Sequence, residues 1–239
     1  LSIEVRSFGS AAGSGPVLYV CNHASYLDVS VLGALLDGRF VAKAEVARWP
    51  VIGALSALQG TIFVERRTQG ARSQAHDLRE ALRTGANLVL FPEGTSSDGN
   101  RVLPFKSALF ASADAIIDGR EVRVQPVTVA YSRHRGLPME RRMRPYFAWY
   151  GDMTLVGHLW TCLGLGGAGV DIVFHKPVRL SDFASRKELA QYCNARVASG
   201  LSDALAGRAG AFSAPVASEM PLAMADWAGF GLLETRHEM

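Results

Sequence analysis

Short β-rich runs alternate along the chain with longer helical stretches, and this alternation restricts the fold more than any other feature of the sequence. The runs are rich in Val, Leu, Ile and Phe and lie at 18–21, 40–42, 61–64, 87–91, 122–130 and 171–174. Chains built in this way form a sheet whose faces are covered by helices. We therefore predict a single α/β domain with a mixed, largely parallel sheet flanked by helices.

Two segments, 70–84 and 186–205, have apolar residues at the intervals that an amphipathic helix requires. In the first these are Ala71, Ala75, Leu78 and Leu82, and in the second they are Leu189, Cys193, Val197, Leu201 and Leu205. Such spacing places the apolar side chains on one side of each helix. Both segments are predicted to be scaffold helices that pack on the sheet.

A third segment, 153–170, contains no Asp, Glu, Lys or Arg. It only just reaches the length of a membrane-spanning helix, and it holds His158 and several glycines, so a spanning helix is not expected. A shorter helix over 155–163 fits better. Its apolar residues on one side are Leu155, Val156, Leu159, Trp160 and Leu163. The pattern leaves two alternatives open, a buried helix and a helix lying at a lipid surface.

The composition shifts to Ala, Gly, Ser and Pro from Gly207 onward, which is typical of flexible segments. We therefore expect a folded domain over 1–206 and a flexible C-terminal tail over 207–239. The apolar residues at 227–233 could order again within that tail.

Charge and cysteine content exclude several functional classes. The formal net charge of +3 is too small to indicate a nucleic-acid partner. The three cysteines lack metal-ligand or redox spacing, so we expect no metal, no cofactor and no disulfide. One local exception is the basic run Arg133, His134, Arg135, Arg141, Arg142 and Arg144, with a single acid, Glu140. It suits an anionic lipid surface or an acidic carrier protein, and equally a solvated loop.

The first chemical signal lies at 20–28, where a predicted strand passes into a predicted helix. Ser25 and Asp28 have the spacing of a capping box, with Ser25 as the N-cap and Asp28 as the third helical residue. His23, just before the cap, can fold its ring back toward the Asp28 carboxylate. A carboxylate that accepts one imidazole N–H leaves the other nitrogen free to take a proton, so this pair would form a general base.

Two further segments add polar groups next to predicted strands. Residues 60–67 end in Arg66 and Arg67, and guanidinium groups bind phosphate or carboxylate through two oxygens at once; a solvated strand edge is the alternative. Residues 91–99 follow a buried strand and begin with Phe-Pro-Glu-Gly-Thr. Glu93 could accept hydrogen bonds from a polyol or amine, and Gly94 would let a substrate approach the backbone, although a simple turn explains the same residues.

Taken together, these segments resemble the glycerolipid acyltransferase family that includes the 1-acylglycerol-3-phosphate acyltransferases. Residues 22–28 are similar to its His-x4-Asp block, 60–66 to its second block and 91–95 to its third, while 124–127 match an apolar strand with a central proline. The resemblance covers roughly residues 15–180.

The resemblance implies catalytic roles for His23 and Asp28, and acceptor-binding roles for Arg66, Glu93, Gly94 and Thr95. It implies an O-acyltransferase that moves a fatty acyl group from an acyl-carrier-protein or coenzyme A thioester to the hydroxyl of a lysolipid, beside a groove for the acyl chain. Direct transfer is favoured over a covalent intermediate on Cys21.

The acceptor is predicted to be 1-acylglycerol-3-phosphate, which would give phosphatidic acid, but two departures weaken that choice. Ser96 stands where many phosphatidate-forming members have Arg, and 105–108 read Phe-Lys-Ser-Ala where the family often shows Phe-Lys-x-Gly. The pattern is also similar to enzymes that acylate lyso-ornithine lipid, and this acceptor is the alternative. A non-catalytic lipid-binding module and a thioesterase are further alternatives.

The expected location is the cytoplasmic face of the bacterial inner membrane. The chain begins at Leu1 with no visible signal peptide, and the family commonly anchors itself by N-terminal apolar helices that this sequence lacks. We therefore expect peripheral attachment to a membrane surface, or an anchor in a segment outside this chain.

Overall fold

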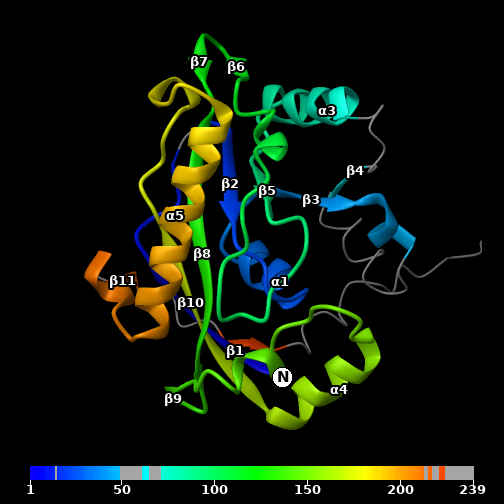
Figure 1. Ribbon diagram of the computed structural model, residues 1–239, viewed down its shortest axis with the longest axis vertical. Coiled ribbons are helices and arrows are strands. Elements are labelled where there is room, and N and C mark those ends of the chain that lie inside the picture. The colour runs from blue at the N-terminus through cyan, green and yellow to red at the C-terminus, as the bar shows by residue number, and fades with distance from the viewer. Residues whose placement is uncertain (14, 49–60, 65–70, 213–214, 217–220, 224–239) are drawn as a thin grey trace, which may run out of the picture.

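The computed structural model describes residues 1–13, 15–48, 61–64, 71–212, 215–216 and 221–223 (Figure 1). Among these residues, ten strands form one sheet. They are β1 Ser2–Phe8, β2 Val17–Cys21, β3 Arg39–Lys43, β4 Ile62–Val64, β5 Leu88–Leu90, β8 Arg123–His134, β9 Leu137–Pro138, β10 Gly167–Phe174, β11 Pro215–Val216 and β12 Pro221–Ala223. A separate hairpin consists of β6 Ile116–Ile117 and β7 Arg120–Glu121.

The main path through the sheet is β11-β1-β10-β8-β2-β5-β3-β4. From β8 to β4 every neighbouring pair is parallel, and β1 is parallel to β10. The antiparallel pair β8–β10 joins these two parts. The predicted mixed, largely parallel sheet is therefore confirmed.

The helices are α1 Leu27–Gly33, α3 Ala71–Arg83, α4 Leu155–Leu165 and α5 Arg186–Leu205. Short 3₁₀ segments occur at η1 Ala44–Arg48, η3 Ser107–Phe110, η4 Arg144–Tyr146, η5 Leu180–Asp182 and η6 Ala209–Phe212. The two predicted scaffold helices agree with α3 and α5 to within a few residues. The helix that follows the His23 segment is α1.

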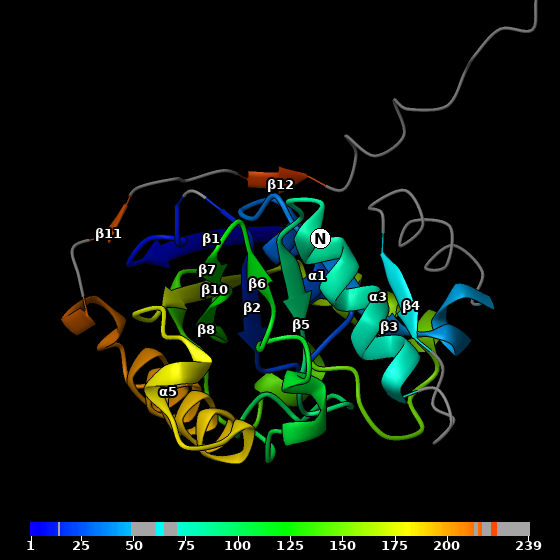
Figure 2. The same ribbon diagram turned by 90° about the horizontal axis from the view of Figure 1, so that it is seen from above.

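Helices cover both faces of the sheet, and β2 lies in its interior. Val17, Tyr19 and Cys21 of β2 belong to the core on the α1 face, while Leu18 and Val20 belong to the core beneath α3 and α5. A strand buried on both faces must be apolar throughout, which explains the continuous Val-Leu-Tyr-Val-Cys run. Figure 2 shows α5 along one side of this sheet.

Part of the region after residue 207 contributes to the sheet. β11 and β12 both pair antiparallel with β1 and extend the sheet beyond that strand. The composition indicated a flexible tail here, but β11 and β12 are strands. They can form because β1 has an open edge with which they pair. The apolar stretch at 227–233 lies outside the described residues.

The third predicted helix forms as α4, and its apolar side is not buried. Val156 and Trp160 are each 79% exposed and Leu163 is 44% exposed, whereas His158 and Cys162 point inward. The buried-helix alternative is thus wrong for this side of α4. None of the helices in the described part of the chain is long and apolar enough to cross a bilayer.

Candidate active site

The site lies where the parallel strands β2 and β5 end side by side. His23 follows β2, and Glu93 follows β5, its neighbour in the sheet. Because the carboxyl ends of parallel strands meet at one edge, residues far apart in sequence come together there. The backbone N–H of His23 donates a 3.0 Å hydrogen bond to Oε1 of Glu93.

His23 and Asp28 contact each other directly. Nδ1 of His23 lies 2.8 Å from Oδ2 of Asp28, which belongs to the first turn of α1. The helix starts at Leu27 with Tyr26 as its N-cap, so Ser25 is not the N-cap that the sequence predicted. Instead, the Ser25 hydroxyl accepts a long 3.4 Å hydrogen bond from the N–H of Leu27, which follows it by two residues.

The Asp28 carboxylate is fully buried and surrounded by donors. Its Oδ2 accepts the backbone N–H groups of Ala24, at 2.7 Å, and Ser25, at 3.0 Å. Its Oδ1 accepts the hydroxyl of Tyr131 at 2.8 Å. Since the carboxylate acts as an acceptor throughout, the hydrogen at the His23 contact belongs on Nδ1, and Nε2 is the nitrogen left to take a proton.

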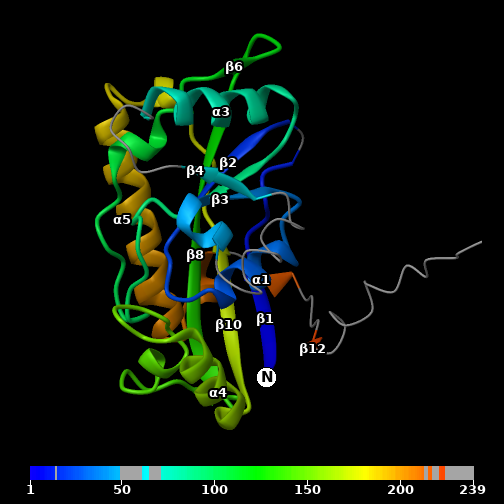
Figure 3. The same cartoon turned by 90° about the vertical axis from the view of Figure 1, so that its right-hand side faces the viewer.

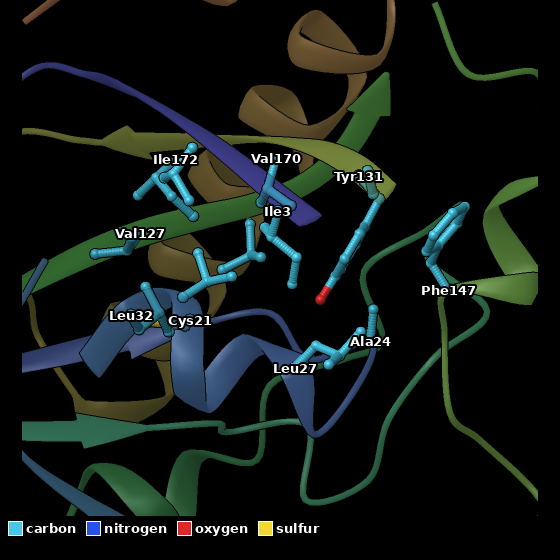
Figure 4. Packing of buried hydrophobic residues seen from close by; sticks show 14 of the residues in the cluster. Ile3, Cys21, Ala24, Leu27, Leu32, Val127, Tyr131, Phe147, Val170 and Ile172 are labelled. Carbon is cyan, nitrogen blue, oxygen red and sulfur yellow. The ribbon is translucent and has the colours of Figure 1, made fainter. Parts of the chain in front are cut away.

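Tyr131 reaches this carboxylate from β8. Figure 4 shows its hydroxyl pointing toward the turn that carries Ala24 and Leu27. Tyr131 is 2% exposed, and its burial together with the Asp28 charge raises the pKa of its hydroxyl well above the usual range. The phenol therefore stays protonated and remains a donor to Asp28. Tyr131 is not among the residues predicted from the sequence, because no motif marks a tyrosine in the middle of a buried strand.

The His23 imidazole is fixed on its other sides as well. The imidazole stacks on the Phe91 ring, and the two ring centroids are 4.1 Å apart. The backbone carbonyl of His23 accepts a hydrogen bond from the N–H of Ser97 at 2.9 Å. Its side chain remains 22% exposed, in contrast to the fully buried Asp28. The structure thus has a buried carboxylate behind an imidazole that solvent or a substrate can reach.

Glu93 supports the backbone of this site. It is 2% exposed, and its second oxygen, Oε2, accepts the N–H of Leu103 at 3.1 Å. Desolvation raises the pKa of Glu93 to about 8, although the backbone hydrogen bonds act in the opposite direction. Both carboxylate oxygens of Glu93 accept hydrogen bonds from backbone amides. If Glu93 also contacts the lysolipid acceptor, as predicted, one of these oxygens must accept a second hydrogen bond.

The residues after Glu93 form an open turn. Gly94 has a φ of +68°, which favours glycine, and a Cβ built there would lie 2.7 Å from Nζ of Lys106. Thr95 is exposed, and so is Lys106. Lys106 therefore places an ammonium group above Gly94, next to the loop that carries Glu93. Arg66, the predicted anion clamp, lies outside the described residues.

Ser96 has a structural partner. Its hydroxyl donates a 2.5 Å hydrogen bond to the carbonyl of Trp149, and the Trp149 N–H in turn binds the carbonyl of Ala24 at 2.8 Å. This hydroxyl thus helps to hold the segment around Trp149 against the turn between His23 and Asp28.

The basic run divides into structural and exposed arginines. Arg133 forms an ion pair with the buried Asp171, and Arg144 binds Asn100. Arg135, Arg141 and Arg142 are exposed, and Arg142 pairs with the exposed Glu140.

Cys21 is poorly suited to act as a nucleophile. It is completely buried, and desolvation raises the pKa of its thiol well above the usual value. The reactive thiolate is therefore disfavoured. Among the described residues, no group of His, Cys, Asp or Glu side chains could hold a metal ion.

Several known proteins are similar to this chain in sequence. Residues 2–130 match the family model described as "Acyltransferase". The chain is 44% identical to a lyso-ornithine lipid O-acyltransferase of Brucella abortus (strain 2308), covering 86% of this chain and 78% of the relative. It is 33% identical to a 1-acyl-sn-glycerol-3-phosphate acyltransferase of Neisseria gonorrhoeae, covering 66% of this chain and 58% of the relative.

A solved structure has the same fold. The crystal structure of the 1-acyl-sn-glycerophosphate (LPA) acyltransferase PlsC from Thermotoga maritima superimposes with a TM-score of 0.59 at 25% identity, covering 84% of this chain and 71% of that chain. With more than half of the residues inside the family model and a relative at 44% identity, the chain belongs to the acyltransferase family and is an acyltransferase.

Proposed function

We propose that this acyltransferase moves a fatty acyl group from an acyl thioester to the free hydroxyl of lyso-ornithine lipid, with His23 as the general base. The observation that carries the chemical part of the proposal is the 2.8 Å contact between Nδ1 of His23 and Oδ2 of Asp28, on an imidazole that stays partly exposed. Such a pair suits removal of a proton from an alcohol.

The proposed reaction is a direct transfer. Nε2 of His23 takes the hydroxyl proton while the acceptor oxygen attacks the thioester carbonyl. As the tetrahedral intermediate collapses, the carbon–sulfur bond breaks and the leaving thiolate takes that proton from the imidazole, so His23 returns to its neutral form. Asp28 stabilises the imidazolium that exists between these two proton transfers, and Tyr131 holds Asp28 in position.

Two observations support lyso-ornithine lipid over 1-acylglycerol-3-phosphate, the acceptor that the sequence alone favoured. The relative at 44% identity carries the name lyso-ornithine lipid O-acyltransferase, whereas the glycerophosphate relative is at 33%. In addition, position 96 holds a serine that binds the Trp149 carbonyl instead of a cation for a phosphate. An ornithine headgroup offers a carboxylate, and the exposed ammonium group of Lys106 can pair with it.

We propose acyl-carrier protein or coenzyme A as the carrier of the donor acyl group, and the cytoplasmic face of the inner membrane as the place of reaction. The support is chemical: a fatty acyl thioester is made in the cytosol, and the product is a membrane lipid. No separate cofactor is needed, because the thioester itself supplies an activated acyl group.

The test is a panel of acceptors offered to the purified chain with one labelled acyl thioester. We expect lyso-ornithine lipid to gain the mass of one acyl group faster than 1-acylglycerol-3-phosphate does. His23→Ala should lower this rate by about 10²–10⁴-fold, as expected for a lost general base. His76→Ala, a change of an exposed histidine on α3, is the matched control and should remain active.

Two outcomes would overturn parts of the proposal separately. Acylation of 1-acylglycerol-3-phosphate alone would refute the acceptor while keeping the reaction. Fatty acid release that is faster than acylation of every lysolipid would instead indicate a thioesterase.

A further inference from the structure

The helix α4 exposes an apolar stripe at one end of the molecule. Val156, Trp160 and Leu163 are 79%, 79% and 44% exposed and are spaced at i, i+4 and i+7, so they share one side of the helix. Met153, just before α4, is 38% exposed, and Tyr146 is 52% exposed. Exposed apolar side chains gathered on one side of a helix mark an interaction site more often than an ordinary solvated face.

The buried side of α4 is connected to the catalytic turn. His158 lies 3.2 Å, through Nδ1, from the hydroxyl of Tyr26, and the two rings meet edge to face at 5.5 Å. Tyr26 is the N-cap of α1, two residues before Asp28. The helix is also held at Cys162, whose thiol binds the carbonyl of Tyr146 at 3.3 Å. A molecule that docks on α4 is therefore separated from the turn between His23 and Asp28 by one layer of side chains.

Positive charge lies on a segment that contacts this helix. The exposed Arg135, Arg141 and Arg142 lie in the segment 134–146, and both ends of this segment contact α4. Nε2 of His134 lies 3.1 Å from the Leu165 carbonyl. The carbonyl of Tyr146 accepts a hydrogen bond from the Cys162 thiol. The exposed acids nearby in sequence are Glu140, which Arg142 neutralises, and Asp152. The helix itself has no charged residue.

We propose that α4 and the arginines beside it form the surface by which this enzyme docks onto an anionic lipid bilayer. Tryptophan and tyrosine favour the membrane interface, aliphatic side chains enter the acyl boundary, and arginines attract anionic headgroups. Figures 1 and 3 both show α4 at one end of the molecule, opposite to β6. This inference rests on the proposed function, because it explains how a lysolipid reaches His23 without leaving the bilayer.

A second copy of the chain is the competing occupant of this surface. Two such faces brought together would place the exposed Arg135, Arg141 and Arg142 of one copy near those of the other, and like charges oppose that contact. An anionic bilayer instead complements both the apolar stripe and the charge around it.

The experiment measures partition of the full chain onto vesicles of phosphatidylglycerol and phosphatidylcholine by sedimentation. Val156→Ser should weaken partition by about 10-fold, and Val156→Ser with Trp160→Ser by about 100-fold, because these side chains would no longer be buried in the bilayer. Ile116→Ser is the matched control, since Ile116 is a β-branched residue that is 68% exposed at the opposite end. It should not change partition.

The charge contribution has its own measurement. Vesicles of phosphatidylcholine alone carry no net charge and should bind the unaltered chain more weakly. Salt at 0.5 M, which shortens the Debye length to roughly 4 Å, should also weaken binding because it screens the charges. Arg141→Ser should reduce the salt dependence while leaving the apolar contribution in place.

Activity assays separate this inference from the proposed function. With lysolipid dispersed in detergent, Val156→Ser and Trp160→Ser should turn over like the unaltered chain, while His23→Ala should bind vesicles normally and be inactive. Vesicle binding without acylation of any lysolipid would refute the function and not the surface. The surface is refuted if the α4 variants bind vesicles as well as Ile116→Ser does, or if they dissolve a dimer of the unaltered chain.

Discussion

The hydroxyl of Tyr131 donates a 2.8 Å hydrogen bond to Oδ1 of Asp28, connecting the buried strand β8 to the first turn of α1. The other oxygen of this carboxylate, Oδ2, accepts a hydrogen bond from Nδ1 of His23. The position of the imidazole therefore depends on a residue that is 103 positions away in sequence from Asp28.

Removing this hydroxyl with Tyr131→Phe should lower kcat by about 10-fold, because one buried oxygen of Asp28 loses its donor. Tyr19→Phe is the matched control, since the Tyr19 hydroxyl is also on a buried strand but binds the Ala12 carbonyl, at 3.4 Å. A kcat for Tyr131→Phe that equals the kcat of Tyr19→Phe would contradict the role of this hydroxyl.

Asp28→Asn should abolish most of the activity while the fold is kept. An asparagine can place its oxygen at the Oδ2 position, where it accepts the same N–H groups, and direct its amide toward the Tyr131 oxygen. The neutral amide cannot stabilise the imidazolium, so we expect a fall of about 10³–10⁴-fold in kcat. Thermal unfolding within a few degrees of the unaltered chain would verify that the loss is chemical; normal turnover would contradict the role of Asp28.

Glu93 should make stability depend on pH. Its pKa is about 8 in the folded chain against an ordinary value of 4.5, so between these values the folded state holds a proton that the unfolded state has released. The associated stability is complete below pH 4.5 and is lost as pH rises through 8. Relative to Glu93→Gln, the free energy of unfolding should fall by on the order of 4 kcal/mol between pH 5 and 9.

Denaturant titrations of both proteins across this pH range measure the difference, and titratable groups other than Glu93 cancel in it. Glu4→Gln serves as the control, because Glu4 is exposed on β1. If the free energy of unfolding of the unaltered chain instead rises with pH relative to that of Glu93→Gln, Glu93 is ionised in the folded chain.

Lys106→Met should raise KM for an anionic acceptor by about 5–10-fold and leave kcat nearly unchanged, because a lost ion pair affects binding more than proton transfer. The effect should diminish at high salt. Lys187→Met removes an exposed lysine at the start of α5 and should alter neither constant. An equal KM for Lys106→Met and the unaltered chain would exclude the ammonium above Gly94 from headgroup binding.

Local patterns were sufficient to predict several features of the molecule. The apolar runs predicted the central strands, since strands buried on both faces must be apolar, and the four-residue spacing of Leu189, Cys193 and Val197 predicted α5. His23 and Asp28 are close in sequence, so their contact follows from one turn of chain. The catalytic roles of His23 and Asp28, and the acceptor-binding roles of Glu93, Gly94 and Thr95, stay predictions until mutants are assayed.

Only the tertiary structure decided the rest. The strand β1 and its pairing with β10, β11 and β12 depend on edges that distant segments provide. The donor from Tyr131, the backbone role of Glu93 and the exposure of Trp160 likewise depend on which elements meet in space. The sequence by itself determined the local periodicities and the His23–Asp28 turn, because these act over a few residues; the chain as a whole determined their surroundings, because burial and long-range hydrogen bonds depend on packing between residues far apart in sequence.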